Sequence, residues 1–437
     1  MTVTSPPPPR WRNWADLADI QPAAQQTPST PENVVAAVAD ARQRGLRVKM
    51  VGSGHSFTDI ALTDGMLLDP TRLSGVTEVD RDALTVTVLA GTPLHELNTR
   101  LRGLGLALHN LGDIDRQTVA GAVSTGTHGT GGVTASLAGQ LEAVELVTGT
   151  GQLVRADRTS DPDLFQAARV GVGALGIITR LTFRVEPAFT LEAVEQPLRF
   201  DEAVDRHDEL VDTHHHVDMY WFPHTDRCLV KMNDRSIDEA RPLSRVRSFV
   251  EDELLSNTAF GLLDRATTRF PRLTKAANQV TSRGWGHRTY ADSSEQVFIA
   301  SRRVRFREME YSLPREHGMA ALREVRALID QSGWRIFFPV EVRATPPDEA
   351  WLSTTYDRSS VYLAFHVGQH VDHRDYFIGV ERVLRAYDGR PHWGKLHTRT
   401  AADLAPAYPR WADFAAVRDR VDPDRIFGNG YLDRVLG

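Results

Sequence analysis

Residues 111–131 constrain this chain more than any other part of its sequence. They read Leu-Gly-Asp-Ile-Asp-Arg-Gln-Thr-Val-Ala-Gly-Ala-Val-Ser-Thr-Gly-Thr-His-Gly-Thr-Gly, so that glycines and hydroxyl side chains alternate with small apolar residues. A buried strand cannot be built this way, because it would bury unsatisfied hydroxyls. A surface linker would not need so many β-branched residues between its glycines. The segment therefore predicts a backbone wrapped closely around a large polar ligand.

A second loop, residues 51–57, has a related composition and follows an expected strand at 48–51. Gly52 and Gly54 allow close approach of the backbone to a ligand and a positive φ. Consecutive amides, together with the hydroxyls of Ser53 and Ser56, can form an anion-binding nest for a pyrophosphate. The loop lacks the third glycine of a Rossmann fingerprint and the Gly-Lys-Ser/Thr of a P-loop. By itself it is also compatible with a plain turn.

A third glycine turn, Gly171-Val-Gly-Ala-Leu-Gly-Ile177, leads into another expected strand. The three loops are separated by short β-branched runs and helical patterns, including a helix expected to begin at Thr30-Pro31-Glu32. Such a mixture predicts an α+β domain made of two sub-blocks, with the glycines in its loops.

Length and composition limit the number of domains and the classes of protein to which the chain can belong. A chain of 437 residues is too long for one comfortable core, which predicts two domains. The net charge of -6 argues against a nucleic-acid binder. No run approaches the roughly 18 apolar residues of a membrane span, and the proline-rich start lacks the apolar core of a signal peptide. Cys228 is the only cysteine, so an intramolecular disulfide and a Cys-based zinc site are excluded. We expect a cytoplasmic protein, with peripheral membrane association left open.

The expected organisation has four parts. Residues 1–13 are predicted to be a mobile arm because consecutive prolines cannot join a helix. Residues 14–188 form the first domain and residues 189–395 the second, which carries expected helices at 201–212 and 314–332 and a strand at 361–365. Residues 396–437 close the chain. The region 233–285 has weak periodicity and is left unassigned.

Together, the three glycine loops resemble the FAD-binding domain of the vanillyl-alcohol-oxidase (PCMH-type) flavoprotein superfamily. Val-Gly-Ser-Gly-His-Ser-Phe-Thr-Asp-Ile-Ala-Leu-Thr-Asp-Gly, from residue 51 onward, resembles its aldonolactone oxidase branch. The resemblance implies a two-domain α+β flavoprotein. Its FAD-binding domain would consist of two α+β subdomains, its substrate (cap) domain of a β-sheet flanked by helices, and its C-terminal segment would return to the FAD domain.

The resemblance also implies which residues contact FAD. In this branch the histidine at the position of His55 is commonly bonded to the flavin 8α-methyl group, whereas members without it bind FAD non-covalently. We expect a covalent link through His55, with hydrogen bonding to phosphate as the alternative; a turn role is equally open for His128. The implied contacts are Gly52, Ser53, Gly54, His55 and Ser56, then Gly112, Thr118, Gly121, Ala122, Thr125, Thr127 and His128, then Gly176 and Ile177.

The second domain carries the candidate chemistry. In Phe338-Pro-Val-Glu-Val-Arg343, the two-residue period of a strand puts Glu341 and Arg343 on one face. Such a pair can be a surface salt bridge, but its apolar neighbours favour a partly buried site candidate. The resemblance implies that the pair faces the substrate side of the flavin. It also implies that Lys395, in His392-Trp-Gly-Lys395, lies near flavin N5 and that His366 is a further substrate-side residue.

No metal site is expected. His392 and His397 are close in sequence, as are His214, His215 and His216. No carboxylate or third histidine stands at ligand spacing from the first pair, and the histidine run is typical of surface polarity.

The resemblance implies FAD-dependent oxidation of L-gulono-, L-galactono- or D-arabinono-1,4-lactone at a secondary hydroxyl. Hydride would pass to flavin N5, and the product would be a 2-keto lactone that enolises to an ascorbate-like compound. The alternatives are an alditol oxidase acting on xylitol or sorbitol, a flavin carrier or sensor without catalysis, and a metal-dependent lactonase. The electron acceptor, whether O2, a redox protein or a quinone, depends on small side chains near the second loop and stays open.

Overall fold

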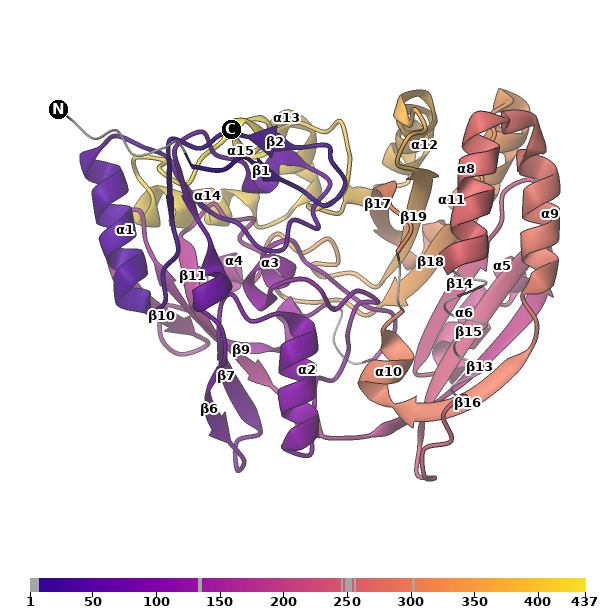
Figure 1. Cartoon of the computed structure of the whole chain (residues 1–437), viewed down its shortest axis with the longest axis horizontal. Coiled ribbons are helices and arrows are strands. Elements are labelled where there is room, and N and C mark those ends of the chain that lie inside the picture. Colours follow the sequence, from indigo (N-terminus) through magenta and orange to yellow (C-terminus); the bar gives the residue numbers. More distant parts are fainter. Residues whose placement is uncertain (1–7, 133–135, 245–246, 248–253, 255–256, 301–302) are drawn as a thin grey trace.

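The computed structural model describes residues 8–132, 136–244, 247, 254, 257–300 and 303–437. Two lobes lie side by side, with the N-terminal third of the chain in one and the middle of the chain in the other (Figure 1). The first helix, α1 (Pro31–Gln43), begins as its sequence predicts. The Thr30 side chain accepts a hydrogen bond from the Asn33 amide, and Pro31 takes the first turn, where no amide donor is needed.

The described part of the first lobe is built on two main sheets, and β8 (Leu106–Ala107) pairs separately with β12 (Glu186–Pro187). The smaller is parallel, in the order β3 (Ala24–Gln26), β5 (Met66–Leu68), β4 (Val48–Met50), and β4 runs directly into the loop at 52–56. The larger is antiparallel, in the order β10 (Leu153–Asp157), β9 (Leu141–Val147), β11 (Ile177–Arg184), β7 (Thr85–Leu89), β6 (Val76–Asp80). Helices α2 (Leu94–Gly103), α3 (Val119–Ser124) and α4 (Pro162–Ala168) complete the lobe. The two sheets are the two α+β sub-blocks that the sequence predicts.

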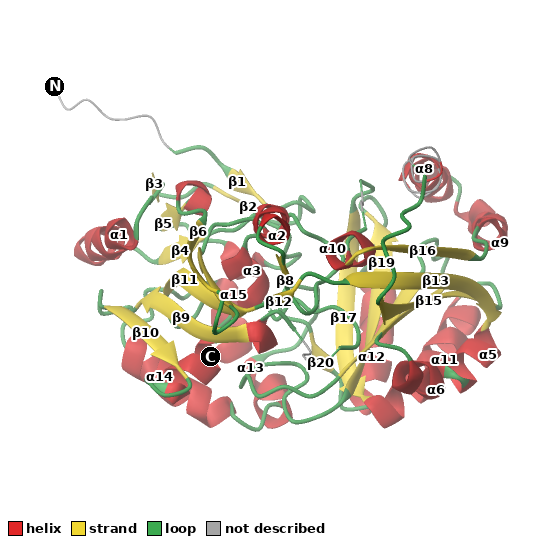
Figure 2. Ribbon diagram, turned by 90° about the horizontal axis from the view of Figure 1, so that it is seen from below, coloured by secondary structure: helices red, strands yellow, loops and turns green. Residues whose placement is uncertain are grey.

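The second lobe is built on one antiparallel sheet of eight strands. Their order is β16 (Arg288–Ser293), β13 (Thr190–Arg199), β15 (Arg227–Ser236), β14 (His216–Trp221), β18 (Val340–Thr345), β19 (Ser360–Gly368), β17 (Phe306–Pro314), β20 (Arg390–Pro391). Figure 2 shows helices on both faces. One face carries α5 (Phe200–Asp205), α6 (His207–Thr213), α11 (Arg315–Ser332) and α12 (Arg374–Ala386), and the other carries α8 (Phe260–Arg269) and α9 (Thr274–Gly284); α10 (Ser294–Phe298) follows β16.

The C-terminal segment crosses back to the first lobe (Figure 1). It contains α13 (Ala401–Leu404), α14 (Trp411–Val421) and α15 (Gly430–Leu436). Leu404, Phe414 and Leu432 are buried in the same hydrophobic core as Val86 and Leu146 of the larger sheet. The segment therefore fastens the two lobes together around their junction.

Two sequence expectations need correction, and the region left unassigned can be described in part. The mobile arm is predicted to reach residue 13, but β1 (Trp11–Arg12) pairs with β2 (Asp19–Ile20), and the buried Asn13 side chain donates to the Ser56 carbonyl; residues 1–7 of the predicted arm lie outside the described residues. The helix expected at 201–212 is divided between α5 and α6. The described part of the unassigned region holds the end of β15 and the pair α8–α9. The apolar side chains of this pair lie on two faces, which obscures the helical period. No helix in the described part of the chain is long and apolar enough to span a bilayer.

Candidate active site

The three glycine loops meet around one cleft of about 940 Å³ in the first lobe. Its walls come from β4 and the loop after it, from α3, and from the turn before β11. The lining includes these expected cofactor residues: Gly52, Ser53, Gly54, His55, Ser56, Thr118, Gly121, Thr125, Gly176 and Ile177.

The loop at 52–56 offers unused hydrogen-bond donors to this cleft. No backbone amide of these five residues donates to another described residue. Gly54 has a φ of +74°, which turns the backbone where other residues would be strained. Buried or half-buried amides normally find partners, so this row of donors fits an anionic ligand such as a pyrophosphate.

Two glycines are required because other parts of the protein come very close to them. A Cβ on Gly52 would lie 2.6 Å from the Thr118 hydroxyl, and a Cβ on Gly176 would lie 2.6 Å from the Val147 carbonyl oxygen. Both distances are shorter than real Cβ contacts. Gly52 therefore lets the first two loops approach each other, and Gly176 lets the third loop pack against β9.

The cleft contains a cation that the sequence interpretation missed. The Lys49 side chain lines it, is 3% exposed and donates to the Gly173 carbonyl at 3.0 Å. Burial lowers the pKa of Lys49 to about 7. Lys49 could have been identified from the sequence, because it interrupts the apolar strand at 48–51. A lysine at a buried strand position needs a polar partner or a ligand.

A second cavity of about 690 Å³ adjoins the first, and His55, Ser56, Gln117 and Thr125 line both. Gly112, Thr127 and His128 line only the second. Ala122 lines neither, because it faces the core from α3 with no exposed surface. The expected contact of its side chain with FAD is therefore not supported by its position.

His55 lies where the two cavities meet. No hydrogen bond to its ring is recorded among the described residues, and the Trp14 ring lies 5.7 Å away, centroid to centroid. Burial, with the positive charges of Lys395 and Arg116, lowers the pKa of His55 to about 4. The imidazole is therefore neutral at physiological pH and has its ring nitrogens available.

Arg343 is enclosed by carboxylates in the second cavity. Its guanidinium lies 2.6 Å from Glu341, 3.0 Å from Asp218 and 3.5 Å from Asp113. Burial opposes its charge, but these carboxylates raise the pKa of Arg343 well above its usual value. Glu341 is 5% exposed and Arg343 8% exposed, so the pair is not a salt bridge on a solvated face.

Glu308, on β17, connects the other two expected substrate-side residues. Its carboxylate forms an ion pair with Lys395 and lies 3.4 Å from His366 Nε2. Burial raises the pKa of Glu308, but Lys395 and His366 outweigh it and lower the pKa well below its usual value. Lys395 lines the cavity, whereas His366 lies behind Glu308 and donates from Nδ1 to the Pro339 carbonyl at 3.3 Å. His366 can therefore act on the cavity through Glu308.

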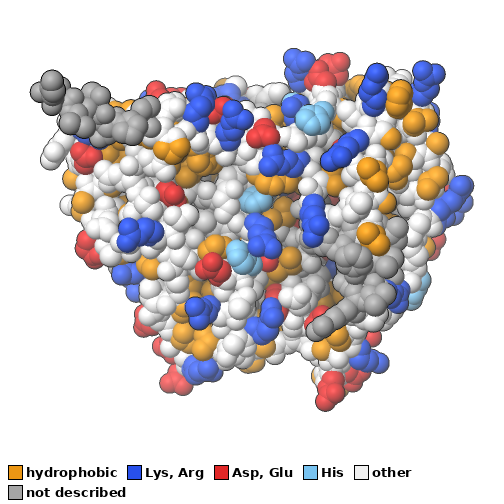
Figure 3. Space-filling view, in the orientation of Figure 1, with side chains coloured by type: hydrophobic (Ala, Val, Ile, Leu, Met, Phe, Trp, Pro, Cys, Tyr) orange, Lys and Arg blue, Asp and Glu red, His pale blue; other side chains and the backbone are white. Residues whose placement is uncertain are grey.

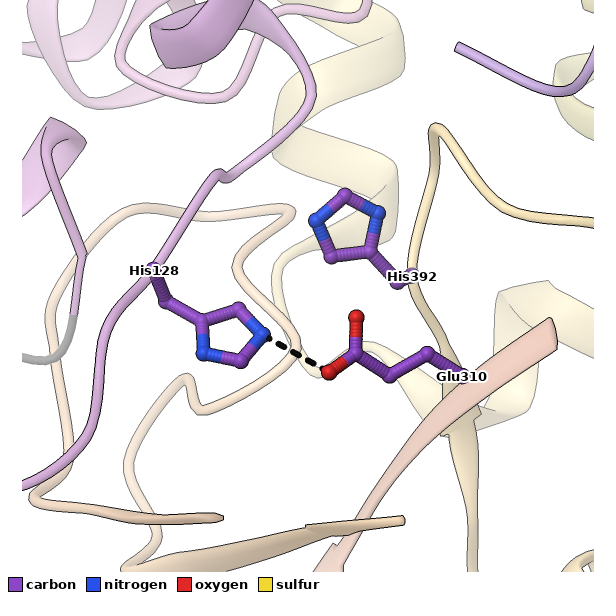
Figure 4. A group of neighbouring side chains, drawn as sticks. All are labelled: His128, Glu310 and His392. Atoms are coloured by element: carbon purple, nitrogen blue, oxygen red, sulfur yellow. Dashed lines mark ion pairs between the residues drawn. The ribbon is translucent and has the colours of Figure 1, made fainter. Parts of the chain in front are cut away.

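Glu310, two residues further along β17, meets two histidines (Figure 4). His128 Nε2 lies 3.3 Å from its carboxylate, and His392 lies beside it. His128 Nδ1 donates to the Gly129 carbonyl at 2.8 Å, so its Nε2 meets the carboxylate favourably only when it carries a proton. Burial opposes ionisation, but the His128 charge and hydrogen bond lower the pKa of Glu310 to about 2.

The sequence predicts no metal site at His392, and the surroundings of its ring nitrogens bear on that prediction. His392 Nδ1 accepts the Gly394 amide at 3.0 Å, and burial lowers the pKa of His392 to about 3. A neutral His392 thus keeps its proton on Nε2. The ligand atoms of His128, Glu310 and His392 all lie within 4.8 Å of one another, so the structure places beside His392 a histidine and a carboxylate that the sequence spacing did not reveal. His397 points elsewhere, with Nε2 3.0 Å from the Tyr431 hydroxyl.

Four carboxylates of the site were not singled out from the sequence: Asp113, Asp218, Glu308 and Glu310. A signal existed for the last two. Glu308 and Glu310 alternate with Met309 and Tyr311 along one strand, which is the same period-two pattern that identified Glu341 and Arg343. Asp113 and Asp218 come from different lobes, and only the fold brings them to Arg343.

Comparisons with known proteins agree with this architecture. Residues 181–435 match the family model described as D-arabinono-1,4-lactone oxidase, and residues 22–157 match the model of an FAD binding domain. The chain is 40% identical to L-gulono-1,4-lactone dehydrogenase of Mycobacterium tuberculosis over 98% of this chain and 99% of the relative. It is 32% identical to L-gulonolactone oxidase of Bos taurus, covering 98% of each. Among solved structures, cholesterol oxidase from Brevibacterium sterolicum has the same fold, with a TM-score of 0.82 at 17% identity over 99% of this chain and 100% of that one.

Proposed function

The chain belongs to the D-arabinono-1,4-lactone oxidase family, and from this we propose that it oxidises a sugar 1,4-lactone with FAD as its cofactor. One observation of the structure supports the proposal above the others. The cleft built by the glycine loops opens at His55 into a cavity lined by Glu308, Glu341, Arg343 and Lys395. A flavin bound along the first would present its reactive ring to a substrate in the second.

The substrate we propose is L-gulono-, L-galactono- or D-arabinono-1,4-lactone. Relatives that align over nearly the whole chain carry the first and last of these sugars in their names. Oxidation removes a hydride from a secondary carbinol carbon and a proton from its hydroxyl, which leaves a 2-keto lactone. FAD, when bound, supplies the acceptor for the hydride at its N5 position.

Four residues in or behind the cavity have separate roles in the proposed reaction. We assign Glu341 to the substrate hydroxyl, whose hydrogen bond it accepts and whose proton it takes as the carbinol is oxidised. Lys395 donates a hydrogen bond to a substrate oxygen, and its ammonium is held in place by Glu308. His366 contributes through Glu308. Arg343 supplies fixed positive charge that would stabilise the negative charge of the flavin once it is reduced.

Residues 14–188 would bind the cofactor, residues 189–395 would bind the substrate, and residues 396–437 would hold these two units together. The structure fits this division because Asp113 of the first unit and Asp218 of the second both contact Arg343. The reacting groups would then be aligned only when the two lobes are correctly packed.

We also propose that the flavin is attached covalently to His55. A neutral imidazole with uncommitted nitrogens is a nucleophile, and this one faces both cavities. After acid precipitation and a denaturing gel, the wild-type band should fluoresce under ultraviolet light, and the His55→Ala band should not. A dark wild-type band would leave His55 the alternative role of binding phosphate.

Turnover of L-gulono-1,4-lactone and xylitol, measured side by side with oxygen and with a dye as acceptor, tests the reaction. The lactone should be oxidised and xylitol should be a poor substrate. The acceptor that supports turnover distinguishes an oxidase from a dehydrogenase that uses a redox protein or a quinone. Faster oxidation of xylitol would favour the alditol oxidase alternative, and ring opening that depends on added metal would favour a lactonase. A cytoplasmic location, with peripheral membrane association left open, is part of this proposal, and cell fractionation tests it.

A further inference from the structure

The helical hairpin formed by α8, the turn Pro271–Leu273 and α9 exposes apolar side chains on its outer face. Leu262 is 60% exposed, Phe270 49%, Leu273 46% and Val280 67%. Figure 3 shows hydrophobic and basic side chains together over α8 and α9, at the upper right of the molecule. Exposed apolar groups concentrated on one element point to an interaction surface.

The same face is strongly basic in an acidic protein. Between residues 258 and 287 the only acid is Asp264, and burial raises its pKa to about 6. The whole chain carries a net charge of -6. The basic side chains of the hairpin are all exposed: Arg265, Arg269, Arg272, Lys275 and Arg283. None of them forms an ion pair with another described residue.

The inner face of the hairpin is fixed to the second lobe. The Phe260 ring lies 4.7 Å from Phe337 and 5.0 Å from Phe338, centroid to centroid. The Asn278 amide donates to the carbonyls of Pro223 and Ile336 at 2.8 and 2.9 Å. Burial of this inner face accounts for the attachment of the hairpin, so the outer apolar side chains have no role in the core of the protein.

We propose that the outer face of the α8–α9 hairpin docks on an anionic lipid bilayer. Amphipathic helices with basic polar faces and exposed Phe and Leu insert shallowly into the headgroup region of such membranes. Each Lys or Arg near the surface adds attraction to acidic lipids. Here the apolar side chains are interspersed with the cations along both helices and at the turn, which suits a fluid anionic surface better than a rigid protein partner with a shaped recess.

Docking at this position would leave the proposed chemistry intact, because the Phe338 ring packs between Phe260 of the hairpin and His366. The inference is therefore independent of the proposed function. Loss of membrane binding should leave lactone oxidation and flavin content unchanged, and loss of lactone oxidation should leave membrane binding unchanged.

Sedimentation with lipid vesicles tests the proposal on the full chain. The protein should bind vesicles of phosphatidylcholine with phosphatidylglycerol, and should bind pure phosphatidylcholine far less. Charge reversal in the double variant R269E/R272E should weaken partitioning roughly thirtyfold or more, since each basic residue contributes about a factor of five. The apolar variant F270S/L273S should also weaken it, at low and at high salt.

The matched control is I378S/R382E, which changes an exposed apolar and an exposed basic residue of α12 on the opposite face of the sheet. It should bind vesicles as the wild type does. Wild-type protein that stays in the supernatant with anionic vesicles would overturn the proposal. Equal binding of R269E/R272E and wild type to anionic vesicles would also overturn it. Binding of the protein to immobilised polyglutamate but not to vesicles would overturn it as well, because the surface would then recognise an acidic polypeptide.

Discussion

The two adjoining cavities share His55 but are built from opposite kinds of group. The cleft of the first lobe presents backbone amides and hydroxyls, with the Lys49 amine, beside Gly173, as a buried titrating group of lowered pKa. The cavity of the second lobe presents ionised side chains in pairs, of which Arg343–Glu341 and Lys395–Glu308 are the closest. Backbone groups hold a cofactor firmly without titrating, whereas paired charges offer the acid–base chemistry that a substrate requires. The difference predicts that changes on the two sides have separable effects.

The largest effect is expected from Arg343. Replacement by Ala removes the cation among three carboxylates, and the rate of flavin reduction by lactone should fall by about 10³-fold. Flavin content should change little, because the residue lies on the substrate side. Stopped-flow absorbance measures the rate, and a normal rate would contradict the assignment. Arg343→Lys is the matched control for folding, since it keeps the charge that neutralises the buried acids.

Glu308 tests whether His366 acts through it. Glu308→Gln should slow reduction by about 10²-fold, because Lys395 loses the partner that positions it. His366→Gln, made in the Glu308→Gln background, should add little further loss. Independent, multiplying effects of the two changes in a double-mutant cycle would show that His366 contacts the substrate by another route.

The Glu308 and Glu310 ion pairs also predict how stability depends on pH. Their folded pKa values are lowered, so the stability that they contribute is fully present above the unfolded value of about 4.5 and is lost as pH falls toward the folded value. Thermal unfolding between pH 6 and 3 should show a steeper loss for wild type than for Glu310→Gln. Parallel profiles would mean that Glu310 is not ionised in the folded protein.

Covalent attachment should follow the protonation of His55. With a pKa of about 4, the imidazole is neutral and nucleophilic above that value. When FAD is added to flavin-free protein, the attachment rate should be flat from pH 8 to about 5 and should fall as pH approaches 4. Acid-stable fluorescence measures the product, and a rate that falls already near pH 6.5 would contradict the burial of this ring.

A smaller effect is expected on the cofactor side. Gly52→Ala places a Cβ against the Thr118 hydroxyl and, in the His55→Ala background where no covalent bond can form, should weaken FAD retention about tenfold, with little effect on the reduction rate of molecules that keep the cofactor. Gly103→Ala is the control, because a Cβ there meets no atom within 4 Å. Equal flavin content in both variants would show that the close approach of Thr118 is unimportant for retention.

The contrast between the cavities also explains what could be predicted from the sequence. The cofactor cleft is made of contiguous loops whose glycines and hydroxyls have few other uses, so most of the residues predicted to contact the cofactor line it. Ala122 lines neither cavity, because a residue on a short helix faces the ligand or the core according to a rotation that composition does not reveal.

The substrate cavity was predicted only in part. Glu341 and Arg343 follow from the alternation of one strand, and Lys395 came from resemblance alone. Asp113, Asp218 and Glu308 reach them from other strands and from the other lobe. Such partners are set by sheet order and by the packing of the lobes, and these depend on long-range contacts that local patterns do not contain. The hairpin α8–α9 was missed for a related reason, since its apolar residues face two directions.

Anaerobic addition of L-gulono-1,4-lactone to the purified protein tests the central claim most directly. The oxidised flavin absorbance near 450 nm should bleach in wild type and in Gly103→Ala, and should persist in Arg343→Ala over the same time. Xylitol at the same concentration should bleach it much more slowly. Flavin that stays oxidised in wild type with each of the three sugar lactones would contradict the claim that this cavity oxidises them.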